Sequence, residues 1–261
     1  KEQVNAWTVW LAAGLVEGTT LHFAAELAHV LDDGDEFRVI PIVTRGITNN
    51  FRDLLYLQGV DCAIVYADYI ESMRDNSDVK RKINYVINMA PAELHVLARP
   101  EIKSLEDLNG RVVNFNTVGT AAAYSGPIIF RALGVKPRNW FEPNSQAMQK
   151  MQKGEVSGIV FMSSAPLDIL NKNEWNDGFH FLPLQYNYNK LGKNYLPSYL
   201  RSTDYPGIIP KGLDIPTIAV PVVLITVDGA KDSDRYRRME RFVQRLFAKW
   251  PELQARIPKL K

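Results

Sequence analysis

The chain lacks most of the features that identify a protein class at sight. It carries one cysteine, Cys62, among 261 residues, which excludes an internal disulfide framework and a zinc site built from cysteines. Its 31 lysines and arginines nearly balance 29 acids, so we expect no broad positive surface for nucleic acid. No apolar run reaches the roughly 18 residues that a membrane-spanning helix needs.

Motifs of catalysis and of nucleotide binding are also missing. The sequence contains no G-x-S-x-G, H-E-x-x-H or G-x-G-x-x-G pattern and no complete P-loop. The four histidines are scattered, and His22 and His29 lie too far apart on one predicted helix to bind the same metal directly. We therefore expect a protein that is not an enzyme and that uses neither a cofactor nor a metal.

What is present is an alternation of strand-like and helix-like segments along most of the chain. A strand ends at Gly14, and helices over 19–31 and 48–58 alternate with strands over 37–43 and 60–67. This alternation predicts an α/β fold with largely parallel sheets, and the number of strands favours two lobes. Residues 185–216 lack periodicity and are predicted to form a functional loop. Arginines 235, 238, 241 and 245 of the last helix are predicted to be solvated.

Four turns that follow strands and open helices are the candidates for binding. They lie at 14–20, 44–50, 116–120 and 163–166, and they are rich in Ser, Thr, Asn and Gly. Ligands of α/β sheets bind at the carboxyl ends of strands, and free N–H groups at helix starts attract anions. The alternative is that these residues are ordinary helix caps, for which Ser, Thr and Asn are preferred.

Several of these segments together resemble a known family. Gly14, Gly18 and Thr19 fit a first turn rich in Gly and Thr, and residues 44–50 fit T-G-G-S-x-x-N with Arg45 and Ile47 as replacements. The late runs 205–207 (YPG) and 214–220 (DIPTIAV) fit as well. In these motifs the chain resembles the TAXI solute-binding proteins, the extracytoplasmic receptors of a class of TRAP transporters.

The resemblance implies the type II periplasmic-binding-protein fold, with two α/β lobes joined by a hinge of crossing strands. It places residues 1–94 plus 186–261 in lobe I and residues 95–185 in lobe II, with the ligand cleft between them. It further implies a periplasmic protein whose signal peptide has been removed, which agrees with a chain that starts at Lys1. Such a receptor would deliver a small organic anion, a carboxylate such as glutamate or 2-oxoglutarate, to the membrane subunits of a TRAP transporter.

The departures from the family motifs fall where the ligand would lie. Arg45 could bind a carboxylate through two hydrogen bonds, pair with Glu17, or face solvent. Val118 stands where the family has Ser, which adds apolar surface. Together with the predicted loop at 185–206, Val118 leaves two alternatives open. The ligand could be larger and aromatic or cofactor-like, or the protein could be a sensor. The predicted ligand contacts are Glu17, Gly18, Thr19, Thr20, Arg45, Asn49, Asn50, Tyr66, Thr117, Val118, Gly119, Thr120, Ser163, Ser164 and Tyr205.

Overall fold

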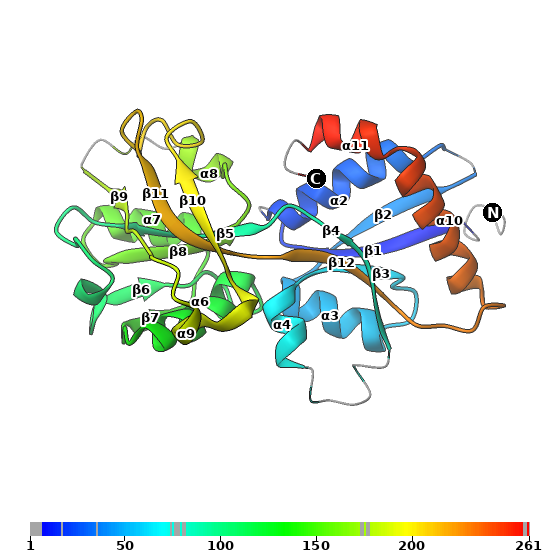
Figure 1. Cartoon of the computed structure of the whole chain (residues 1–261), viewed down its shortest axis with the longest axis horizontal. Helices are drawn as coiled ribbons and strands as arrows, with labels where there is room; N and C mark the ends of the chain where they lie inside the picture. Colours follow the sequence, from blue (N-terminus) through cyan, green and yellow to red (C-terminus); the bar gives the residue numbers. More distant parts are fainter. Residues whose placement is uncertain are drawn as a thin grey trace. The chain divides into compact units, whose positions relative to one another are not determined.

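The structure, a computed structural model, consists of two compact units (Figure 1). Unit 1 contains Lys1–Ala90 and Val222–Lys261, and unit 2 contains Pro91–Pro221. The structure describes residues 7–257 and 260, apart from 17, 35, 74, 76–78, 80–81, 173–174 and 176–177. Unit 2 is thus a single insertion into unit 1. Residues 186–221, which were expected in lobe I, belong to unit 2.

Unit 1 is built on a five-stranded sheet with the strand order β2-β1-β3-β12-β4. Its strands are β1 (Thr8–Gly14), β2 (Arg38–Val43), β3 (Cys62–Tyr66), β4 (Ile83–Asn88) and β12 (Val222–Val227). β1 pairs in parallel with β2 and β3, whereas β12 pairs antiparallel with both β3 and β4. β1, β2, β3 and β4 therefore run in one direction. β12, the last of these strands along the chain, lies between β3 and β4 and runs in the opposite direction.

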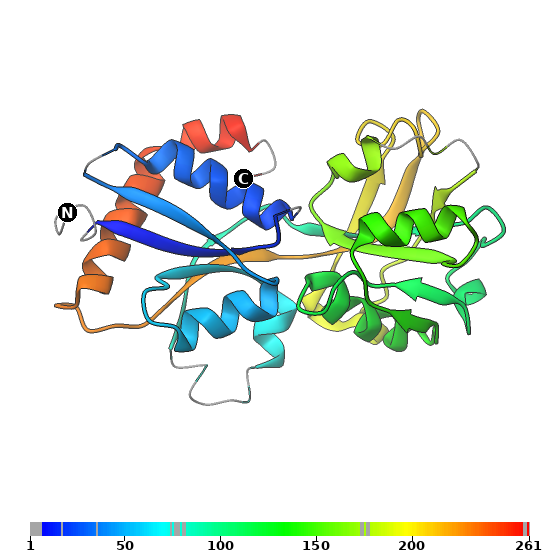
Figure 2. The same cartoon turned by 180° about the vertical axis from the view of Figure 1, so that it is seen from behind.

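Helices cover both faces of the unit 1 sheet. α2 (Thr19–Leu31) joins β1 to β2, and α3 (Ile47–Tyr56) joins β2 to β3. These connections step across the sheet in opposite directions, and because crossovers are right-handed, the two helices lie on opposite faces, as Figure 2 shows. α10 (Asp234–Ala248) and α11 (Trp250–Arg256) pack beside α2, and the short α4 (Ala67–Ser72) follows β3.

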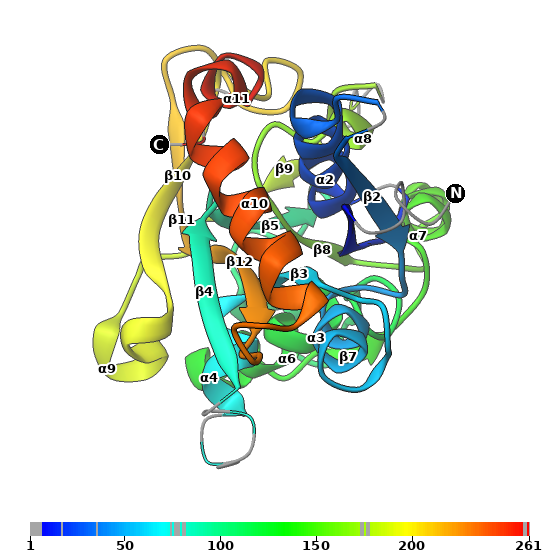
Figure 3. The same cartoon turned by 90° about the vertical axis from the view of Figure 1, so that its right-hand side faces the viewer.

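Arginine side chains attach α10, the helix labelled in Figure 3, to the rest of unit 1. Arg238 forms an ion pair of 2.7 Å with Asp61, whose side chain is 1% exposed and also accepts the N–H of Trp10. Arg245 forms an ion pair of 2.5 Å with Asp33. The prediction of a solvated arginine face is therefore wrong for Arg238 and Arg245, since periodicity alone cannot reveal acidic partners far away in the sequence.

Unit 2 contains a seven-stranded sheet in the order β10-β11-β5-β8-β6-β7, with β9 paired to β5. Its strands are β5 (Ala92–Ala98), β6 (Val112–Asn114), β7 (Arg138–Trp140), β8 (Gly158–Ser163), β9 (His180–Phe181), β10 (Leu196–Arg201) and β11 (Asp214–Val220). β6 is parallel to β7 and β8, and the remaining pairs are antiparallel. β10 and the start of β11 fall in the stretch predicted as a loop, so that prediction is wrong there.

The helices of unit 2 follow the same crossover rule. α6 (Ala121–Leu133) joins β6 to β7, and α7 (Asn144–Gln152) joins β7 to β8. Short helical segments complete the unit: α8 (Asp168–Asn171), α9 (Tyr188–Leu191) and the 3-10 turns η1 (Glu106–Leu108) and η2 (Gly192–Asn194). No helix in the described part of the chain is long and apolar enough to cross a membrane. The fold class is confirmed as mixed α/β on two sheets.

The close approach of α6 to the unit 2 sheet depends on Gly126. A Cβ atom at this position would lie 2.4 Å from Cδ1 of Phe115, a ring that is 0% exposed and packs edge-to-face on Phe130. We expect G126A to lower the free energy of unfolding by about 1–2 kcal/mol, because overpacking outweighs the gain in helix propensity. Urea unfolding measures this difference.

Gly207 provides the control for this substitution. A Cβ atom there would meet nothing within 4 Å, so we expect G207A to be as stable as the wild type or slightly more stable. If G126A unfolded at the same urea concentration as G207A, the packing of α6 on Phe115 would not be the constraint described here.

Candidate functional site

Three of the strands in unit 1 end at one edge of its sheet. These are the parallel strands β1, β2 and β3, which end at Gly14, Val43 and Tyr66. Tyr66 is paired with Val222, the first residue of β12, so the chain returns from unit 2 at this same edge. The predicted turns of unit 1 therefore lie at the edge where the chain passes between the two units.

The first two predicted turns lie against each other. Gly14 has a φ of +117°, which favours glycine, and a Cβ atom there would lie 2.8 Å from Oγ1 of Thr20 and 3.9 Å from both the Cα of Gly46 and the Nδ2 of Asn50. Glycine at position 14 thus allows both turns to approach the end of β1. The first two of the four predicted turns are therefore neighbours in unit 1.

The buried side chain of Asn50 holds the second turn, residues 44–50, in place. Its side chain is fully buried, and its Nδ2 donates to the carbonyl of Ile64 in β3 at 2.8 Å. The hydroxyl of Thr44 donates to Oδ1 of Asn50 and accepts the N–H of Gly46 at 3.1 Å. Asn50 is therefore a residue that shapes the turn.

The helices that leave this edge begin without side-chain caps. α2 follows Gly18 and α3 follows Gly46, and these N-cap glycines have no side chain that could accept an N–H of the first helical turn. An uncapped helix start presents N–H groups and a partial positive charge to an anion. Arg45 directly precedes Gly46, its side chain is exposed, and it has no ion-pair partner among the described residues. Glu17, its alternative partner, lies outside those residues.

The predicted turns of unit 2 also lie at the edge where the chain enters and leaves that unit. β8 ends at Ser163, which is paired with Glu93, and β11 ends at Val220, which is paired with Ala92. β6 is parallel to β8, so the turn after β6 lies at the same edge. In each unit taken by itself, the predicted binding turns lie at the end of the sheet where the chain enters or leaves that unit.

The turn between β6 and α6 combines a helix cap with an exposed apolar residue. The hydroxyl of Thr120 donates to the carbonyl of Thr117 at 2.8 Å and accepts the N–H of Ala123 at 3.2 Å. Thr120 is thus the ordinary N-cap that was the alternative interpretation. Val118 is 74% exposed, and Thr117 and Gly119 beside it are half-buried. This part of the turn remains accessible to a ligand.

Tyr205 does not line an open surface. It is 0% exposed, its hydroxyl lies 2.7 Å from Nε2 of His95 and accepts the N–H of Leu167 at 3.0 Å, and burial raises the pKa of its phenol. The prediction of a direct ligand contact at Tyr205 is therefore corrected to a position in the core of unit 2. Sequence reasoning missed His95 and Glu93, whose only signal is that both are polar within an otherwise apolar strand.

Burial separates the predicted contacts into two groups. Residues that are at least partly accessible are Gly18, Thr19, Arg45, Asn49, Thr117, Val118, Gly119 and Ser163. Residues that are buried are Thr20, Asn50, Tyr66, Thr120, Ser164 and Tyr205. The accessible group supplies backbone N–H groups, hydroxyls, an amide and one guanidinium, and this is chemistry suited to an anion.

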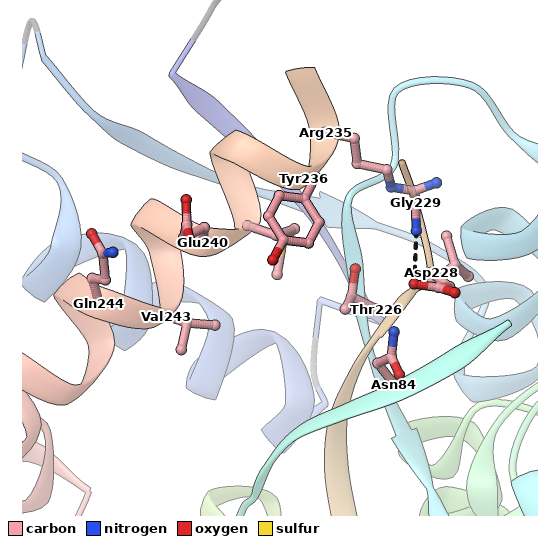
Figure 4. Close-up of a pocket in the computed structure, with 11 residues that line it drawn as sticks. Asn84, Thr226, Asp228, Gly229, Arg235, Tyr236, Glu240, Val243 and Gln244 are labelled. Carbon is pink, nitrogen blue, oxygen red and sulfur yellow. Dashed lines mark hydrogen bonds between the residues drawn. The ribbon is translucent and has the colours of Figure 1, made fainter. Parts of the chain in front are cut away.

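A separate cavity of about 280 Å³ lies in unit 1, beside the last residues of β12 (Figure 4). Tyr236, Glu240, Val243 and Gln244 project from α10 around it, while Arg235 also lines it and donates to the carbonyl of Val60. The remaining lining residues are Asn84, Thr226, Val227, Asp228, Gly229 and Met239. The cavity lies at the end of β12 remote from Val222, and no predicted contact lines it.

Among the described residues, no three His, Cys, Asp or Glu side chains are placed to hold a metal ion. Cys62 is fully buried in β3, and burial raises the pKa of its thiol well above the ordinary value, which keeps it protonated. Cys62 therefore packs as a small apolar side chain.

Comparison with solved structures defines the class of the fold. An ancestral arginine-binding protein bound to arginine is 13% identical, with 96% of this chain and 97% of that chain covered and a TM-score of 0.57. The substrate-binding protein of an amino acid ABC transporter is 11% identical over 96% and 98%, with a TM-score of 0.52. The effector-binding domain of QuiR in complex with shikimate is 13% identical over 93% and 97%, also with a TM-score of 0.52. The architecture is that of type II periplasmic binding proteins.

The family follows from the sequence itself. The model of the NMT1-like family matches residues 12–255, and the chain belongs to this family. A search of curated proteins finds no match.

Two adjacent asparagines of α3 test the structure of the second turn. We expect N50A to lower the free energy of unfolding by about 1–3 kcal/mol, because the carbonyl of Ile64 and the hydroxyl of Thr44 lose a buried partner. N49A, at a half-buried position, is expected to change stability by at most about 0.5 kcal/mol. Equal losses for the two variants in urea unfolding would contradict the assigned role of Asn50.

Proposed function

We propose that this protein is an extracytoplasmic receptor that captures a small organic anion, a carboxylate, and does not transform it chemically. The observation that carries the proposal is the pair of uncapped helix starts beside the exposed Arg45. N–H groups at a helix start hold carboxylate oxygens, and an arginine can bind a carboxylate through two parallel hydrogen bonds. Both contributions favour negative charge at the same edge of unit 1.

The turns of unit 2 carry polar groups of the same kind. Thr117 and Ser163 have hydroxyls and Gly119 has a backbone N–H, and all three lie at the end of the unit 2 sheet where the parallel strands β6 and β8 finish. Delivery of the solute to TRAP-type membrane subunits, and a periplasmic location, follow from the resemblance to TAXI receptors and belong to the proposal.

A sensor or binding module for a larger ring compound is the second candidate function. It is favoured by Val118, an apolar side chain that is 74% exposed in the middle of a turn otherwise made of polar and small residues. An exposed valine at this position offers contact to an apolar ring rather than a hydrogen bond. The complex of the related effector-binding domain with shikimate, a ring that carries a carboxylate, combines both kinds of chemistry.

A thermal-shift screen distinguishes the two candidates. Glutamate, 2-oxoglutarate, shikimate, arginine and a quinone are tested separately against the purified protein. A ligand at 100 times its Kd stabilises the fold by about 2.7 kcal/mol, which raises Tm by about 5 °C or more. We expect a shift with a small carboxylate and none with arginine. A shift with the quinone alone would favour the second candidate.

The role of Arg45 is tested by charge selectivity. We expect R45A to weaken binding of the carboxylate found in the screen about tenfold or more, because a charge-assisted hydrogen bond contributes about 1.5–3 kcal/mol. A neutral analogue, the amide of the same compound, should lose little. R52A is the control, since Arg52 is an exposed arginine of α3, the helix that follows Arg45, and its side chain lies near Asp53. Equal losses for the acid and the amide in calorimetric titrations would remove Arg45 from the site.

A further inference from the structure

The turn that follows β8 is attached to the rest of unit 2 by three hydrogen bonds, two of which are buried. The hydroxyl of Ser164 donates to the carbonyl of Pro91 at 2.7 Å. The N–H of Ala165 donates to Oε2 of Glu93 at 2.9 Å, and the N–H of Leu167 donates to the hydroxyl of Tyr205 at 3.0 Å. Pro91 directly precedes β5, and Glu93 is the second residue of that strand. The turn is therefore held by β5 and Tyr205 in addition to its own strand.

The chemistry of the partners of Tyr205 determines which atom donates and which accepts in each of its hydrogen bonds. Nδ1 of His95 lies 2.9 Å from the carbonyl of Glu93, which can only accept, so Nδ1 carries the proton. In a neutral imidazole Nε2 then accepts, and the Tyr205 hydroxyl donates to it at 2.7 Å. The phenol oxygen remains free to accept the N–H of Leu167. One chain of hydrogen bonds thus runs from the backbone of β5 to the start of α8.

Packing leaves this chain of hydrogen bonds little freedom to rearrange. His95 and Tyr205 are both 0% exposed, and their rings meet edge-to-face with 5.5 Å between centroids. Phe181 packs on the ring of Tyr205 with 5.1 Å between centroids. Loss of the phenol hydroxyl would leave two buried polar groups, the N–H of Leu167 and Nε2 of His95, without the partner they have now.

The geometry points to Tyr205 and His95 as positioning residues of the proposed site, which hold the turn at 163–167 in the conformation that presents Ser163 to a ligand. The inference rests on the proposed function only in assigning a ligand to Ser163. Tyr205 acts on that ligand through the backbone of Leu167 and without touching it. Tyr205, which lies in the turn after β10, thereby determines the geometry of the turn after β8.

Hydrogen exchange without any ligand tests the positioning itself. In Y205F we expect the amides of Ala165 and Leu167 to exchange at least tenfold faster than in the wild type, while residues 121–125 of α6 remain unchanged. T217V is the matched control, because it removes another buried hydroxyl of unit 2, which donates to the carbonyl of Leu94 at 2.5 Å, without touching the turn. Unchanged exchange at Ala165 and Leu167 in Y205F, or an equal increase in T217V, would overturn the inference.

Binding of 2-oxoglutarate, measured by calorimetric titration, tests the consequence for the site. We expect Y205F to bind at least tenfold more weakly than the wild type, and T217V to bind within twofold. H95Q, whose amide oxygen can accept the phenol proton, should retain affinity, and H95L should lose it as Y205F does. Wild-type affinity in Y205F despite faster exchange would overturn the positioning role. If the wild-type protein itself fails to bind 2-oxoglutarate, that ligand assignment fails, and the exchange measurement alone decides whether Tyr205 positions the turn.

Discussion

The organisation of unit 2 depends on the complete burial of β5. Its seven residues are all buried, and the strand is paired with β8 on one side and with β11 and β9 on the other. A strand in this position has no exposed face, so each polar side chain on it must find a partner inside the protein. Glu93 and His95 find theirs in the turn after β8 and in Tyr205. The need to satisfy buried polar groups thereby determines where a candidate binding turn lies.

In unit 1 a buried polar side chain also joins a turn to a neighbouring strand. Asn50 is buried like Glu93, and it joins the turn after β2 to the backbone of β3. In both units a buried polar side chain connects a turn to a neighbouring strand, while the outward groups of the turn stay accessible. The inner contacts fix the geometry, and the outer groups are left to meet a solute.

The sequence predicts the fold well wherever periodicity is strong. The helix predicted over 19–31 and the buried strand over 60–67 correspond to α2 and β3. The prediction fails at β10, whose mostly exposed side chains show no apolar alternation. It also fails at Tyr205, because a tyrosine in a polar stretch looks like a surface residue until the fold brings His95, 110 positions away, against it. Burial of polar groups is a property of tertiary contacts, which local pattern does not contain.

The insertion of unit 2 into unit 1 has a consequence for synthesis on the ribosome. Unit 2 is one continuous segment, so all of its strands have been synthesised before residue 222 is added. The sheet of unit 1 is still incomplete at that moment, because β12 lies between β3 and β4 and is the described strand that joins them. The inserted unit can therefore fold first, while β4 waits with both edges unpaired for the final 40 residues of the chain. Synthesis of unit 1 therefore starts before that of unit 2, and its sheet is completed only afterwards.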